Sequence, residues 1–95
     1  MEYQEFLRSI EQDEKPPEKL SKALQALWYD AKGDWQVAHD LIDHLNDSDS
    51  SRVHAYLHRV EGDLWNAQYW YSRAQSQEFH GELKEEWDFL VKSFL

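Results

Sequence analysis

The chain has 95 residues, with no cysteine, 19 acidic and 10 basic side chains, and a formal net charge of −9. A chain of this length forms one small domain, and the lack of cysteine excludes disulfides, thiolate metal ligands and a cysteine nucleophile. The negative charge argues against a nucleic-acid partner and against an anionic membrane surface, because both attract cationic proteins. An acidic start and the lack of a long apolar run predict a soluble, cytoplasmic protein.

The spacing of apolar residues predicts helices throughout the chain. The first is a short amphipathic helix over residues 3–10. Two consecutive prolines interrupt it, and Pro17 suits the first turn of a second helix. The apolar stripe of that second helix runs from Leu20 to Ala31.

Gly33 is expected to end the second helix in a left-handed conformation, and Asp34 to cap the third. The apolar face of the third helix runs from Val37 to Leu45. Residues 46–51 are polar and are predicted to form a loop. A fourth helix follows, with an apolar stripe over residues 53–60.

Gly62 and Asp63 repeat this combination of a helix end and a helix cap. The fifth helix then carries apolar residues at helical spacing from Leu64 to Ala74. A break is expected over residues 76–81, before a last helix over residues 83–94.

One segment occurs twice, with an offset of 29 residues. Small residues, a glycine and an aspartate recur at equivalent places in the two copies. A period of this size is typical of stacked helical hairpins. The matching residues are Ala26, Gly33, Asp34 and Ala38 in the first copy, and Ala55, Gly62, Asp63 and Ala67 in the second.

The repeated hairpin resembles the tetratricopeptide repeat and related helix–turn–helix repeats. The resemblance implies an all-α, right-handed α-α superhelix of about five or six helices, with repeats at about 18–46 and 50–76 and a capping helix at about 81–95. It also implies a protein- or peptide-binding scaffold. The period is shorter than the usual value of about 34, and the typical final proline is missing, so related repeats of another period are an alternative. The stretch over residues 54–74 also resembles a group of small bacterial proteins, which implies no activity.

Arg52, Tyr56 and Arg59 share one face of the fourth helix, because they are spaced at i, i+4 and i+7. The corresponding positions of tetratricopeptide repeats face the concave groove. Two guanidinium groups beside a phenol could bind a carboxylate, such as a peptide C-terminus. The alternative is that they pair with acidic residues of the chain itself, such as Asp30 or Glu61.

Trp65 and Tyr69 lie one turn apart on a flank of the fifth helix, outside its apolar stripe. They are expected to pack under the C-terminal helix or, alternatively, to form an exposed aromatic patch that binds a partner. Residues 89–95 are apolar almost all round, so the last helix is expected to cap the stack, with self-association as the alternative.

His54, His58 and Glu61 form the densest cluster of possible metal ligands, at i, i+4 and i+7 on the fourth helix. His39 or His44 on the third helix could add a fourth ligand. A hydrogen-bonded, structural histidine pair is the favoured interpretation. A metal-binding protein or small metal-dependent hydrolase that uses these residues is the alternative.

No nucleophile elbow or glycine-rich phosphate loop occurs in the sequence. We therefore expect no catalytic residues, no cofactor and no metal. The function that the sequence favours is the binding of a protein or peptide through Arg52, Tyr56, Arg59, Trp65 and Tyr69.

Overall fold

The computed structural model describes all 95 residues and contains six helices and no strand, so the predicted all-α class is confirmed. None of these helices combines the length and the hydrophobicity needed to cross a membrane. The helices are α1 (Tyr3–Gln12), α2 (Lys22–Ala31), α3 (Trp35–Ile42), α4 (Ser48–Val60), α5 (Leu64–Arg73) and α6 (Leu83–Phe94).

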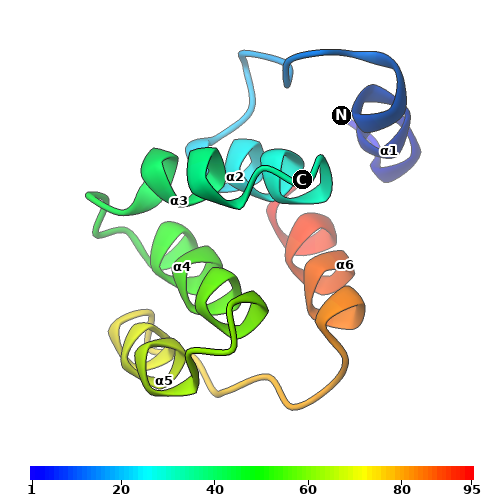
Figure 1. The fold of residues 1–95 in the computed structure, drawn as a ribbon. Coiled ribbons are helices and arrows are strands. Elements are labelled where there is room, and N and C mark those ends of the chain that lie inside the picture. Colours follow the sequence, from blue (N-terminus) through cyan, green and yellow to red (C-terminus); the bar gives the residue numbers. More distant parts are fainter.

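Two helical hairpins, α2–α3 and α4–α5, make up the middle of the chain (Figure 1). Helix α4 is central, because it packs against α2, α3, α5 and α6. Helix α6 returns after the second hairpin and lies against both α2 and α4. The seven residues from Ser51 to Leu57 are consequently all buried, although several of them are polar.

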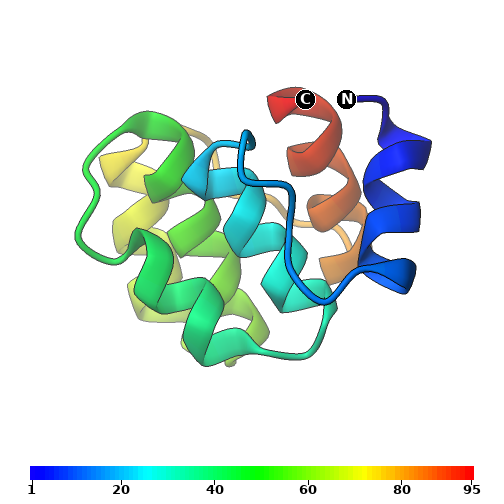
Figure 2. The ribbon, with the colours of Figure 1, turned by 90° about the horizontal axis from the view of Figure 1, so that it is seen from above.

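Helix α1 lies beside α6, and the two ends of the chain come close together (Figure 2). The phenyl ring of Phe6 is fully buried, with its centroid 6.0 Å from that of the Trp87 indole. Tyr3 donates a hydrogen bond of 2.6 Å from its hydroxyl to a carboxylate oxygen of Asp88. These contacts attach the first helix to the last one.

The turns of the two hairpins have the same local structure, as predicted. Gly33 and Gly62 have φ angles of +86° and +78°. Asp34 caps α3 by accepting from the backbone N–H of Val37, and Asp63 caps α5 in the same way. The backbone N–H of each glycine donates to the carbonyl oxygen three residues earlier, and that of each aspartate to the one five residues earlier. Both hairpins therefore reverse the chain through one hydrogen-bonding pattern.

The small residues of the repeat lie where helices approach each other. Ala38 on α3 and Ala67 on α5 are both buried, which confirms that prediction. A larger side chain at either position would overpack the contact.

Two predicted helix starts are wrong. Helix α2 begins at Lys22, not near Pro17, because the Ser21 hydroxyl accepts from the N–H of Leu24 and makes Ser21 the N-cap. Helix α4 begins at Ser48, inside the predicted loop, because Asp47 caps it by accepting from Ser50. In both places a short polar side chain starts a helix, as Ser and Asp commonly do.

Gly62→Val is expected to lower the free energy of unfolding by about 1–3 kcal/mol, because a β-branched residue is strained at positive φ. An added Cβ would meet no atom within 4 Å, so the cost comes from the backbone conformation and not from a clash. Urea denaturation measures the effect. Gly62→Asn is the matched control, since asparagine tolerates this conformation better. Equal denaturation midpoints for the Val and Asn variants would contradict the prediction.

Candidate functional site

Arg52, Tyr56 and Arg59 do not line an exposed concavity, so that expectation is wrong. Arg52 and Tyr56 are buried. The hydroxyl of Tyr56 donates to Asp30 Oδ2 at 2.9 Å, as the alternative interpretation allowed. Both guanidinium groups donate to one carboxylate, that of Glu86, and the Arg59 Nη1–Oε1 distance is 2.6 Å.

Glu86 comes from α6, which covers this face of α4. Its side chain is 0% exposed and also accepts a hydrogen bond of 2.6 Å from the Tyr71 hydroxyl. Burial, followed by this hydrogen bond, raises the pKa of Tyr71 to about 12, so the phenol remains a donor. The two arginines thus belong to an internal polar network that joins α4, α5 and α6.

Trp65 and Tyr69 are not covered by the C-terminal helix. Trp65 is 74% exposed, and Tyr69 is also exposed, with its hydroxyl accepting from Arg73 at 3.0 Å. The neighbouring Leu64 is exposed as well. The expectation that they pack under α6 is wrong, because α6 packs against α2 and α4 instead.

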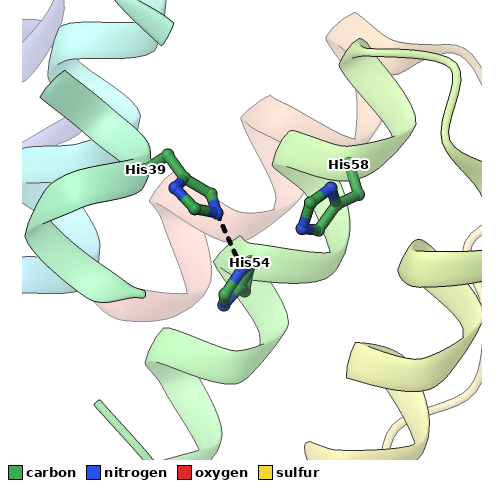
Figure 3. A group of neighbouring side chains, drawn as sticks. All are labelled: His39, His54 and His58. Carbon is green, nitrogen blue, oxygen red and sulfur yellow. Dashed lines mark hydrogen bonds between the residues drawn. The ribbon is translucent and has the colours of Figure 1, made fainter. Parts of the chain in front are cut away.

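Three histidine side chains meet where α3 packs against α4 (Figure 3). His39 comes from α3, whereas His54 and His58 come from successive turns of α4. One ring nitrogen of each lies within 4.8 Å of the other two. The closest pair is His39 Nε2 and His54 Nε2, 3.0 Å apart. We call these residues the histidine triad.

Two indole rings hold the triad in place. Trp35, one turn before His39 on α3, stacks on that imidazole with a centroid distance of 4.8 Å. Trp70 reaches from α5 and stacks on His54 at 3.9 Å. His54 is consequently buried, while His39 and His58 keep partial contact with solvent.

The surroundings keep two of these imidazoles uncharged. Burial, followed by the nearby His39 and His58, lowers the pKa of His54 to about 4. Burial, followed by His39, also lowers the pKa of His58. Neutral imidazole is the form that binds metal ions.

Hydrogen bonding within the protein does not satisfy the triad. In the contact between His39 and His54, one Nε2 must donate and the other accept. The Nδ1 atom of His54 is buried and has no partner in the protein. The favoured pairing of His54 with His58 is therefore replaced by a pairing of His54 with His39, and one polar atom is left without a bond.

The other predicted metal ligands do not join the triad. Glu61 is the exposed C-cap residue of α4. His44 is 71% exposed and lies against its neighbour Asp43, with 3.3 Å between ring nitrogen and carboxylate oxygen. Asp43 Oδ2 also lies 4.0 Å from His39 Nδ1, which is beyond hydrogen-bond distance.

The spacing of the triad fits a transition-metal ion. A tetrahedral zinc ion with Zn–N distances of about 2.0–2.1 Å separates its ligand nitrogens by about 3.3 Å. The His39–His54 separation of 3.0 Å is close to that value, and a ring nitrogen of His58 lies within 4.8 Å of both. No protein-family model, curated protein or solved structure matches the chain, so the side-chain geometry carries the functional assignment.

In chelator-treated protein, the free energy of unfolding is expected to fall by about 3 kcal/mol between pH 6.5 and pH 4. In the unfolded chain His54 takes up a proton near pH 6.5, whereas in the folded protein it does so only near pH 4. The unfolded state thus binds more protons in this window, and stability decreases as the pH falls. Urea titrations at several pH values measure the slope. His54→Phe should flatten it, and an unchanged slope in that variant would contradict the prediction.

Proposed function

We propose that the protein binds one divalent transition-metal ion, zinc in the first instance, through the histidine triad. The observation that carries the proposal is the convergence of three imidazole nitrogens from two helices within 4.8 Å. Imidazole ligands suit zinc, copper, nickel and iron, and zinc has no geometric preference from its d-electrons. The neutral state of His54 and His58 removes proton competition near neutral pH.

Three protein ligands leave one position of a tetrahedral ion free. Closed four-ligand sites are typical of structural zinc, whereas three ligands and an open position are typical of sites that bind water or substrate. His39 and His58 retain solvent contact, so an outside donor can approach the triad. Two stacked indoles hold the rings, and the carboxylate of Asp43 lies 4.0 Å from His39.

Calorimetric titration of chelator-treated protein with zinc sulfate tests this proposal. We expect one ion per chain, together with stabilisation by about 2.7 kcal/mol at a free zinc concentration of about 100 times the dissociation constant. His39→Ala and His54→Ala should each abolish the one-site isotherm. The matched control is His44→Ala, because this imidazole is exposed and lies outside the triad. Undiminished binding in His54→Ala, or an equal loss in His44→Ala, would refute the site.

We also propose that the two hairpins form a tetratricopeptide-like repeat with a right-handed superhelical sense. The recurrence of one turn device after 29 residues supports this, with the same cap, the same positive φ and the same backbone hydrogen bonds. Helix α6 then covers the side of the stack where α2 and α4 lie next to each other.

The second candidate function is protein binding through an exposed face of α5 formed by Leu64, Trp65 and Tyr69. A solvent-exposed patch of large apolar side chains usually marks a partner site, and Trp65 is the most exposed residue of this face. Affinity capture from native lysate with Trp65→Ala as bait should lose any partner that this face binds. Phe89→Ala removes an exposed ring from α6 and is the control. If Trp65→Ala captured every partner that the unaltered protein captures, this face would be excluded as a binding surface.

A further inference from the structure

A cleft of about 500 Å³ lies between α1, α6 and the C-terminal end of α2, with α4 behind it, and it is a second candidate binding site. Its walls are apolar and come from Leu7 and Ile10 on α1 and from Trp87 on α6. Its polar groups include Asp30 and Tyr56. This volume is within the range of about 300–1,000 Å³ that small-molecule sites occupy.

Asp30 is a carboxylate whose hydrogen-bonding capacity is largely unused. The Tyr56 hydroxyl donates to Oδ2 at 2.9 Å, and no protein group donates to Oδ1. None of the ion pairs in the structure involves Asp30. Burial raises the pKa of its carboxyl group, and the hydrogen bond from Tyr56 opposes that shift. A partly desolvated carboxylate with a free oxygen gains from a cationic partner.

We propose that this cleft binds a small organic cation, a primary amine with an apolar body. The ammonium group pairs with Asp30, and the apolar body lies against Leu7, Ile10 and the Trp87 ring. Glu11 adds a second negative charge to the lining, and an aromatic face also attracts cations. Lys84 is the only basic residue of the lining, and its charge opposes the ligand.

The cleft is separate from the histidine triad. Tyr56 lies two residues from both His54 and His58 on α4, so its side chain points to the opposite side of that helix. The amine proposal therefore stands or falls independently of metal binding.

Titration with phenethylamine and with its neutral analogue phenethyl alcohol, followed by NMR shifts of the indole N–H groups, tests the proposal. We expect the amine to bind at least about tenfold tighter than the alcohol, because a hydrogen bond between charged groups contributes more free energy than one that involves a neutral hydroxyl. Asp30→Asn should remove that preference, because it keeps the acceptor for Tyr56 and loses the charge. Glu14→Gln removes a charge from an exposed position outside the cleft and should preserve the preference. Equal affinity for both compounds, or a preference that survives Asp30→Asn, would overturn the proposal.

Lys84→Met keeps the proposal testable if Asp30→Asn does not fold. Lys84 is exposed and makes no hydrogen bond or ion pair through its side chain, so its replacement should not disturb the fold. The loss of its positive charge is expected to strengthen phenethylamine binding several-fold and to leave the alcohol unaffected. Amine binding that is unchanged or weakened in Lys84→Met would refute the role of charge in this cleft.

Discussion

Glu86→Ala is expected to lower the free energy of unfolding by about 3–5 kcal/mol, the usual cost of removing one partner from a buried ion pair. The substitution would leave the guanidinium groups of Arg52 and Arg59 without their shared carboxylate. It would also remove the acceptor of the Tyr71 hydroxyl. Chemical denaturation followed by circular dichroism measures the change.

Two further variants separate charge from shape at this position. Glu86→Gln keeps most of the volume and some hydrogen bonds, so an intermediate loss is expected. Replacing Glu86 by leucine together with Arg52 and Arg59 by methionine should recover much of the stability, because apolar side chains of similar volume often substitute for a buried ion pair. Glu78→Ala alters an exposed carboxylate just before α6 and is the control. If Glu86→Ala lowered the free energy of unfolding by no more than Glu78→Ala does, Glu86 would not be essential to the packing of α6.

Trp28→Ala is expected to cost about 3–5 kcal/mol, as is typical of removing a large aromatic side chain from a core. Trp28 is 0% exposed in the main hydrophobic core. Its Nε1–H donates to the Ser9 hydroxyl at 3.0 Å, which links α2 to α1. The variant should therefore loosen α1 as well as leave a cavity. Thermal and urea denaturation measure the loss, and amide hydrogen exchange in α1 tests the loosening.

Trp65→Ala is the matched control for this experiment. It removes the same side chain from a position that is 74% exposed, so stability should change by about 0.5 kcal/mol or less. Trp28→Phe keeps an aromatic ring and loses only the hydrogen bond and part of the volume, so its effect should fall between the two. Equal losses in Trp28→Ala and Trp65→Ala would contradict the position of Trp28 in the core.

The helical hairpins could be predicted from the sequence because their signals are local. A glycine with positive φ followed by a capping aspartate involves neighbouring residues only, and it recurs at residues 33–34 and 62–63. Helix starts were harder to predict, since several polar residues near Ser21 and Asp47 could serve as caps. The caps are Ser21 and Asp47, because their side chains accept hydrogen bonds from the backbone N–H groups of Leu24 and Ser50.

The candidate metal site could be predicted only in part. The spacing of His54 and His58 by four residues places them on one helical face, which a sequence reveals. Glu61, one further turn along the same helix, was predicted as the third ligand and His39 or His44 only as a possible fourth, and the choice of Glu61 is wrong. The packing of α3 on α4 brings in His39, while Glu61 remains exposed at the helix end.

The all-α class, the turns and the face shared by Arg52, Tyr56 and Arg59 follow from local patterns in the sequence. The internal position of this face depends on tertiary contacts, because α6 places Glu86 against it and the α2 residue Asp30 accepts from Tyr56. Helical periodicity states which side chains share a side of a helix, whereas the element that covers that side depends on contacts between residues far apart in the chain. Glu86 is separated from Arg52 by 34 residues, and no local pattern encodes that pairing.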